Sequence, residues 1–500
     1  MSVRSNIILN TVSQIYMALL SVATLPFYID MLGSQAYGLV AFFMQLQTMI
    51  GLLDIGISAT VSRNTALFGA GKLARNDYFA MLRSIEFSFV VVALCILGGV
   101  FSAPVLAQSW LNLGDFSVVV ARDTIQLIFV VIALRWMQTY YRAIVLGAEQ
   151  LVWLGWFNIL VSSVRIFGVL PYLYLVSGDV LDFFLYQIVV NFIELMLLFF
   201  RTNKIAGFRQ GERFGKINKT ALSDAIASSL VVGLTSLLWA VITQADKFLA
   251  SGILTIADYT AYSLVISISS ILLLLSGTCI YAIGPAMARL LAQDKKSEAV
   301  AVFRNISLVV SLMLGAASVV VIGWSEALLF AWTGNVPLSQ KAAEFLPLYM
   351  LATLFFALGN LSYAINYAIG NFQLRLKYSI ISLLLYLPAL ALLLWLFGEQ
   401  GLVYGWLMVN LLFFVVPQFF LYRQLDDSLY ITSMLQDVCI PVMAAMSVLL
   451  LMFIVDLRPL NRLEIFAVLT LIGLLSLVVA VLLSRARLLL LPQLRQLLRK

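Results

Sequence analysis

Apolar runs long enough to cross a membrane follow one another along the whole chain. A helix rises about 1.5 Å per residue, so about 20 apolar residues span a hydrocarbon core of about 30 Å. The pattern predicts fourteen membrane-spanning helices, near residues 7–30, 37–67, 82–106, 118–146, 151–176, 181–201, 222–252, 257–291, 302–332, 342–369, 376–397, 402–422, 436–455 and 463–484. We therefore expect an all-α polytopic membrane protein.

The composition agrees with this expectation and narrows the chemistry. Of the 500 residues, 62% are hydrophobic and 11% are charged, whereas about 25% of a typical soluble chain is charged. The chain has no histidine, which removes histidine proton relays, the usual zinc sites and Ser–His catalysis. No predicted loop has room for the acid or base of a membrane glycosyltransferase. We expect no catalytic residues, no metal and no enzyme activity.

The basic residues predict the orientation of the chain. Of its 31 Lys and Arg residues, 24 lie in or beside loops on one side if the N-terminus is cytoplasmic. Such a bias is typical of the cytoplasmic side of an inner membrane, so we expect both termini there. The net charge of +7 therefore indicates topology and contact with anionic lipid, and not nucleic-acid binding. The tail 485–500 mixes Leu with Arg and is typical of an interfacial helix.

The longest basic loop, 202–220, divides the chain into an N-lobe of six spans (1–215), a C-lobe of six spans (216–425) and a last part with two spans and a basic tail (426–500). The segments 32–37 and 254–259 resemble each other weakly and lie at equivalent places in the two lobes. Six spans each make the lobes parallel repeats, related by an axis along the membrane normal. We expect the substrate to bind in a cleft between them.

Polar residues form stripes along four spans in equivalent places of the two lobes, the first, second, seventh and eighth. The stripe of the first span includes Asn10 and Gln14, and that of the second includes Asp54. The stripe of the seventh span includes Asp246, and that of the eighth includes Tyr281. Small and hydroxyl residues also favour close helix packing in bilayers. Because the stripes recur in equivalent spans, we interpret them as the lining of a hydrated cavity. The last two spans carry no such stripes.

Charges deep within spans are rarer, since each costs at least about 2.5–3.5 kcal/mol at a helix centre. Near the midplane lie Asp54, Arg135, Arg165 and Glu194, all in the first lobe; Asp246 and Lys247 lie nearer the outer end of their span. One interpretation is a cationic path for an anionic headgroup, formed by Arg63, Arg135, Arg165 and Lys247. The other is that Arg135 or Arg165 pairs with Glu194 and locks the lobe together. Asp54, Glu194 and Asp246 are candidate sites for a coupling H⁺ or Na⁺.

Two sets of residues carry a resemblance to a known family. The first is Leu25-Pro26, Leu32-Gly33, Tyr37-Gly38, Leu53-Asp54-Ile55-Gly56 and Arg63; the second is Gln244-Ala245-Asp246-Lys247-Phe248, Leu254, Asp258-Tyr259 and Tyr262. With the order of spans, they resemble the polysaccharide-transport branch of the MOP exporter superfamily, the Wzx-type O-antigen flippases. Thr260 departs from the pattern, since the family commonly has Gly there.

The resemblance implies two MATE/MOP-like lobes that alternate between inward and outward access. It implies flipping of an undecaprenyl-pyrophosphate-linked oligosaccharide from the cytoplasmic to the periplasmic leaflet, with a polysaccharide polymerase and a chain-length regulator as partners. The arginines would attract the pyrophosphate, and Asn10, Gln14 and Tyr281 would contact the sugars. The alternatives are a multidrug exporter of the same fold, a lipid II flippase, a membrane glycan polymerase and a structural membrane subunit.

Overall fold

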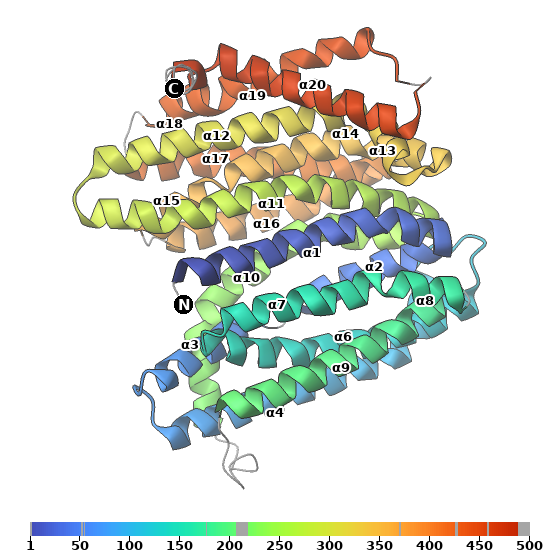
Figure 1. Cartoon of the computed structure of the whole chain (residues 1–500), viewed down its shortest axis with the longest axis vertical. Coiled ribbons are helices and arrows are strands. Elements are labelled where there is room, and N and C mark those ends of the chain that lie inside the picture. The colour runs from blue at the N-terminus through green and yellow to red at the C-terminus, as the bar shows by residue number, and fades with distance from the viewer. Residues whose placement is uncertain are drawn as a thin grey trace. The chain divides into compact units, whose positions relative to one another are not determined.

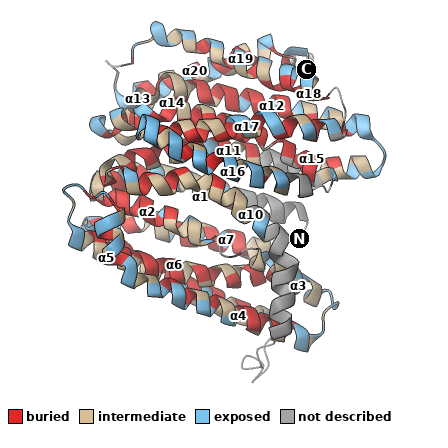
Figure 2. Ribbon diagram, turned by 180° about the vertical axis from the view of Figure 1, so that it is seen from behind, coloured by how far each residue is buried: buried red, intermediate tan, exposed pale blue. Residues whose placement is uncertain are grey.

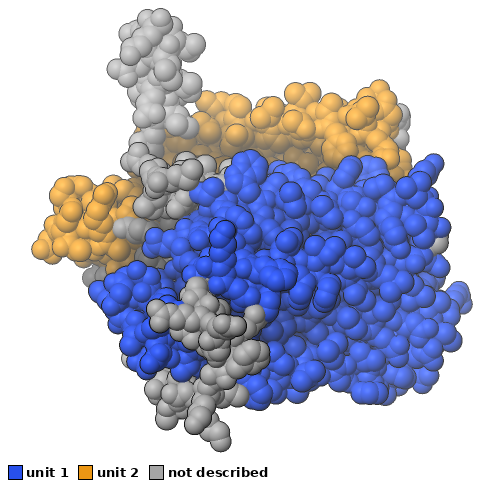
Figure 3. Space-filling model, turned by 60° about the horizontal axis from the view of Figure 1, so that its bottom comes forward, with its two compact units in different colours: residues 1–260 blue, residues 261–500 orange. Residues whose placement is uncertain are grey.

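The computed structural model describes the chain except for residues 1–2, 52–53, 55, 177, 207–218, 370–371, 426–428, 458–459 and 489–500. The described residues fold into helices, and their one β contact is an isolated parallel bridge between Asn112 and Thr255. They divide into two compact units, residues 1–260 and 261–500 (Figure 3). The predicted interfacial helix at 485–500 lies largely outside the described residues.

Unit 1 is a helical bundle with α6 at its centre (Figure 1). Its helices are α1 (Val3–Leu32), α2 (Ser34–Gly51), α3 (Ile57–Gly69), α4 (Arg75–Gly98), α5 (Ala103–Val105), α6 (Val118–Gly147), α7 (Leu151–Ser162), α8 (Val169–Leu175), α9 (Val180–Ala206) and α10 (Lys219–Ile253). Helix α6 contacts α2, α3, α4, α7 and α9, so a polar side chain on α6 can meet partners from several other helices.

Unit 2 contains most of α11 (Ile256–Ala292) and the helices α12 (Lys296–Gly323), α13 (Ser325–Thr333), α14 (Val336–Gly359), α15 (Ser362–Ile369), α16 (Phe372–Phe397), α17 (Gln400–Leu425), α18 (Leu429–Ser433), α19 (Ile440–Met446) and α20 (Arg462–Leu483). The pairs α14–α17, α16–α17 and α12–α14 pack side by side. Helices α19 and α20 pack on α12 around an apolar core that includes Leu312, Val319, Ala445 and Ile472.

Many residues on the exposed faces of the helices (Figure 2) are large and apolar, as a bilayer requires. The clearest case is the span Leu376–Phe397, in which an 18-residue window with a mean hydropathy of 2.5 has 11% of its residues buried. Leu384 is 68% exposed and Trp395 is 80% exposed. Exposed apolar surface of this extent is stable only in contact with lipid or another apolar surface.

Ten helical segments among the described residues are long and apolar enough to cross a membrane. The other predicted spans coincide with α1, α2–α3, α6 and α10, and Tyr16–Leu32 of α1 is an apolar helix of shorter described length. Each of the fourteen predicted spans therefore coincides with a helical segment. The protein is an all-α, multi-pass membrane protein.

The second span is not the continuous helix that its pattern predicts. Helix α2 ends at Gly51 and α3 begins at Ile57, and Gly56 has a left-handed φ of 78°. Glycine adopts this conformation at little cost, so Gly56 permits the break. Broken helices within a membrane expose backbone groups that must be satisfied, and they often form binding sites.

The boundary between the compact units follows Thr260. Helix α10, which comes after the basic loop, contacts α2, α3 and α4 of unit 1. The division into lobes 1–215, 216–425 and 426–500 concerns the sequence repeat and stays a prediction.

Candidate functional site: an arginine cluster in unit 1

A buried carboxylate lies where α6, α7 and α9 meet. The side chain of Glu194, on α9, has no exposed surface, and each of its oxygens meets an arginine. Oε1 pairs with Nη2 of Arg142 on α6, and Oε2 lies 3.2 Å from Nη1 of Arg165. Arg142 also donates to Oδ1 of the buried Asn158 on α7. The carboxylate therefore holds three helices together.

Arg165 lies in a turn of π-helix, Ser163–Phe167, which separates α7 from α8. A π-turn adds a residue to the helix and leaves carbonyl groups without their usual partners. Neighbouring helices supply donors to three consecutive carbonyls: the hydroxyl of Tyr186 to Val164 at 2.7 Å, the amide of Gln187 to Arg165 at 3.1 Å, and the hydroxyl of Tyr28 to Ile166. Because each freed carbonyl has a donor, the irregular turn that presents Arg165 is a fixed part of the bundle.

Arg135 differs from the other two arginines because its partners are neutral. Its Nε donates to Oδ1 of Asn191 at 3.0 Å, and its Nη1 donates to Oε1 of Gln47. Its guanidinium carbon lies 4.9 Å from the ring centroid of Phe43. Within the described part of the chain, no carboxylate forms an ion pair with it.

The cluster thus holds three guanidinium groups and one carboxylate, an excess of two positive charges. The side chains of Arg142 and Arg165 are 29% and 18% exposed, while Glu194 is fully buried. A guanidinium in contact with hydrocarbon is costly, so the exposed parts of these groups require water or an anion. The cluster can therefore bind an anionic group.

The predicted pairing of Arg165 with Glu194 is present, whereas Arg135 makes no such pair. Sequence reasoning missed Arg142, because it lies close enough to a cytoplasmic loop to be counted with the topology signal. Its spacing carried the information: Arg135, Gln138 and Arg142 follow the i, i+3, i+7 pattern of one helix face. Gln138 donates to the main-chain oxygen of Asn191 at 2.9 Å.

Asp54 lies in the break between α2 and α3. Its Oδ1 accepts hydrogen bonds from the backbone N–H of Ser58 at 3.0 Å and from the Ser58 hydroxyl at 2.8 Å. The carboxylate is half-buried, and no cation of the described residues pairs with it. A carboxylate that caps a half-helix within a span has the chemistry to bind a cation or a proton.

The other predicted site residues make none of the contacts described for this cluster or lie outside what the structure describes. Asp246 and Lys247 are buried on α10 and pair with each other, with Lys247 Nζ 3.3 Å from Oδ1 of Asp246. Gln14 and Arg63 are exposed. Asn10 and Tyr281 lie in α1 and α11, and their side chains are outside the described structure.

The two sets of residues that carry the family resemblance meet at one end of unit 1. The oxygen of Ile256 lies so close to Gly38 that a Cβ there would overlap it. The hydroxyl of Thr260 donates to the main-chain oxygen of Ser34 at 2.6 Å. The departure from the family pattern at Thr260 therefore has a physical role, because the hydroxyl joins the two motifs.

Unit 2 contains a second buried carboxylate between two arginines. Asp437 has no exposed side-chain surface and lies in the π-helical turn Met434–Cys439. It pairs with Arg304 of α12 at 2.7 Å and with Arg485, just after α20, at 3.2 Å. Sequence reasoning missed this triad because Arg304 lies at a helix end and the last two spans carry no polar stripes. Among the described residues, no group of three or more His, Cys, Asp or Glu side chains could hold a metal ion.

Several solved membrane transporters are similar to this chain in fold. The lipid II flippase MurJ in an inward closed conformation has a TM-score of 0.71 and 11% sequence identity, covering 95% of this chain and 98% of its own. An inward-facing multidrug resistance MATE family transporter has a TM-score of 0.66 and 13% identity, covering 85% and 96%. A MOP superfamily transporter from Pyrococcus furiosus has a TM-score of 0.58 and 13% identity, covering 84% and 94%.

The chain therefore has the fold of these solved MOP superfamily transporters. The sequence then identifies the branch. Residues 3–291 match the polysaccharide biosynthesis protein family, and residues 231–392 match the MatE family. No curated protein sequence matches the chain. Because the first match covers more than half of the 500 residues, the chain belongs to the polysaccharide biosynthesis protein family, in the polysaccharide-transport branch of the superfamily.

Proposed function

We propose that this transporter flips an undecaprenyl-pyrophosphate-linked oligosaccharide, such as an O-antigen repeat unit, from the cytoplasmic to the periplasmic leaflet of the bacterial inner membrane. The observation that carries the proposal is the excess of positive charge in the arginine cluster of unit 1, in a chain of the polysaccharide biosynthesis protein family. Sugar hydroxyls and a pyrophosphate each cost several kcal/mol to bring into hydrocarbon, so crossing needs a polar path. Arginine suits that path because its planar fork binds phosphate oxygens in pairs.

The three arginines have different roles in this proposal. Glu194 neutralises part of the charge of Arg142 and Arg165 and fixes their positions. Arg135 pairs with no carboxylate of the described residues and is held by the amide oxygens of Gln47 and Asn191. An anionic group outcompetes a neutral amide for a guanidinium, since charge-assisted hydrogen bonds are roughly twice as strong. Arg135 is therefore the first contact for the pyrophosphate or an acidic sugar.

A gradient of H⁺ or Na⁺ drives the transport, and Asp54 is the coupling site. The contacts of the three candidate carboxylates support this choice. Glu194 is held by two arginines and Asp246 is paired with Lys247, whereas Asp54 has hydrogen bonds to one serine. Its position in a broken span is typical of ion sites in transporters.

The direct test is deletion of the gene in its native host. We expect lipid-linked repeat units to accumulate on the cytoplasmic face and surface polysaccharide to be lost. Wild-type protein should restore it, and Arg135→Gln should not, although it is present at the normal level. Unchanged surface polysaccharide in the deletion strain would refute the proposal.

Two alternatives within the same fold have distinct outcomes in that strain. A multidrug exporter predicts raised drug sensitivity with normal surface polysaccharide; the excess of positive charge disfavours its cationic cargo. A lipid II flippase predicts a defect in cell-wall synthesis. Lipid II also carries a pyrophosphate, so the arginine cluster suits both lipids. The two lipids differ in their sugar portion, and the defect of the deletion strain distinguishes them.

The flippase proposal includes an orientation and partners. Both termini lie in the cytoplasm, as the distribution of Lys and Arg predicts. A polymerase and a chain-length regulator then use the flipped units at the periplasmic face. Cysteine labelling from each side of the membrane tests the orientation: residues 3–5, 487 and 488 should be labelled from the cytoplasmic side alone.

A further inference from the structure

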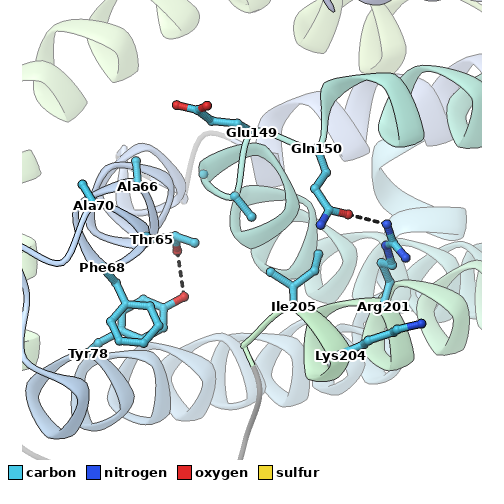
Figure 4. A pocket seen from close by; sticks show the side chains of 13 residues that line it. Thr65, Ala66, Phe68, Ala70, Tyr78, Glu149, Gln150, Arg201, Lys204 and Ile205 are labelled. Carbon is cyan, nitrogen blue, oxygen red and sulfur yellow. Dashed lines mark hydrogen bonds between the residues drawn. The ribbon is translucent and has the colours of Figure 1, made fainter. Parts of the chain in front are cut away.

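An open pocket lies at the end of unit 1 where α3, α6 and α9 end and α4 and α7 begin (Figure 4). Its volume is about 840 Å³, within the range of roughly 300–1,000 Å³ found for small-molecule sites. The transport proposal does not use it, because none of the residues of the arginine cluster lines it. The distribution of basic residues predicts that this end faces the cytoplasm.

One wall of the pocket is aromatic and has its hydrogen bonds satisfied internally. The rings of Phe68 and Tyr78 stack with centroids 4.2 Å apart. The hydroxyl of Tyr78 donates to Thr65 Oγ1 at 3.1 Å, and Thr65 donates to the main-chain oxygen of Val61 at 2.8 Å. The hydroxyl groups of Tyr78 and Thr65 already donate to partners within the protein, so these residues shape the pocket and do not supply donors to a charged ligand.

The opposite wall carries positive charge that the described residues do not neutralise. Arg201 donates from Nη2 to Oε1 of Gln150 at 2.5 Å (Figure 4). Its guanidinium carbon lies 4.9 Å from the ring centroid of Trp153. Its Nε is buried without a hydrogen-bond partner in the described structure. Lys204, one turn further along α9, is exposed, and neither residue forms an ion pair with any described carboxylate.

Basic residues at the C-terminal end of a helix are common, because they favour the negative end of the helix dipole. That explanation accounts for the positions of Arg201 and Lys204. It does not account for the way that Gln150 and Trp153 hold the Arg201 guanidinium at the wall of an open cavity, with no carboxylate of the described residues paired to it. The Nε has no accessible surface, so an anionic ligand in the pocket would meet the outer Nη atoms of the guanidinium.

We propose that this pocket binds a phosphate group, with Arg201 as the directional donor and Lys204 as a second charge. Gln150 and Trp153 hold the guanidinium in place. Phosphate is favoured over a cationic ligand because two cations and one exposed carboxylate, Glu149, line the pocket. The phosphate comes either from the headgroup of an anionic lipid or from free phosphate in the cytoplasm. The site is independent of the transported lipid.

The experiment uses the full chain in two settings that separate these sources. In phosphatidylcholine nanodiscs, inorganic phosphate is titrated and the shift of the unfolding temperature gives the affinity. In nanodiscs that also contain phosphatidylglycerol, native mass spectrometry counts the retained anionic lipid. A response in either setting supports the site and shows whether the phosphate group comes from free phosphate or from an anionic lipid. No response in both overturns it.

Variants show whether the response arises in this pocket. Arg201→Gln and Arg201→Lys should weaken binding roughly tenfold or more, because both remove the paired donors. Lys204→Gln should weaken it less, and Glu149→Gln should strengthen it by removing a negative charge. Lys72→Gln, an exposed basic residue near the end of α3 that does not line the pocket, is the matched control and should have no effect.

Three results with the variants would also overturn the proposal. One is equal binding by the wild type and the Lys204→Gln variant. Another is weaker binding on Glu149→Gln, which would indicate a cationic ligand. The third is an equal loss on Lys72→Gln, which would indicate nonspecific attraction to the surface. If the Arg201 variants do not fold, the variants at Lys204 and Glu149 still test the proposal. Both positions are exposed, so these substitutions should leave folding intact.

Discussion

Replacing Glu194 with Gln tests whether the arginine cluster is built as described. The change removes the buried charge and keeps the shape of the side chain, leaving Arg142 and Arg165 without their shared partner. Breaking a buried ion pair costs about 3–5 kcal/mol. The two arginines keep 29% and 18% of their side-chain surface exposed and can partly rehydrate, so we expect a loss of about 2–3 kcal/mol.

A double-mutant cycle separates the contacts of Glu194 from its general effect. Residues in contact couple by about 0.5–3 kcal/mol, and residues without shared partners combine additively. Glu194→Gln and Arg165→Gln should couple within that range. Glu194→Gln and Arg135→Gln should couple much less, because Arg135 binds Asn191 and Gln47 instead.

Thermal unfolding of the purified protein in one detergent measures all the variants under the same conditions. Arg135→Gln alone should lose about 1–2 kcal/mol, the value of its hydrogen bonds to neutral groups. Equal stability of wild type and Glu194→Gln would refute the buried triad. Strong coupling between Glu194 and Arg135, with none to Arg165, would show that the partners have been assigned wrongly.

Three further substitutions test other parts of the account. Asp54→Asn should uncouple transport from the ion gradient and leave folding intact; a flipping rate that still follows the gradient would exclude this site for coupling. Gly38→Val should cost about 1–3 kcal/mol or abolish folding, because its Cβ would overlap the oxygen of Ile256; a normal unfolding temperature would contradict that packing. Asp437→Asn should cost about 2–3 kcal/mol by leaving two arginines without their carboxylate, whereas Glu344→Gln, which breaks an exposed ion pair, should cost less than about 1 kcal/mol; equal losses would refute the buried triad of unit 2.

The membrane-spanning helices could be predicted because hydropathy is a local property of the chain. The break between α2 and α3 could not, since the helical pattern continues across it. It depends on Gly56, whose left-handed conformation the composition of the segment does not reveal. The extent of each compact unit likewise depends on long-range contacts, such as those of α10 with α3 and α4.

The sequence alone indicated Arg135 or Arg165 as the partner of Glu194 and could not choose between them. The choice depends on which way the helix faces point, and the π-turn at Ser163–Phe167 shifts the helix phase around Arg165. Arg142 was overlooked because it lies near a cytoplasmic loop, where a basic residue is explained by topology alone. In the structure Arg142 and the deeper Arg165 pair with the same carboxylate, that of Glu194.

The most direct test of the proposed function is a flipping assay in proteoliposomes. The substrate is an undecaprenyl-pyrophosphate-linked oligosaccharide, and a glycosidase added outside the vesicles cleaves the sugars that reach the outer leaflet. We expect the purified protein to make the inner-leaflet pool cleavable, with Arg135→Gln slowing this at least about tenfold. A pool that stays protected in vesicles that do transport an organic cation would contradict the account.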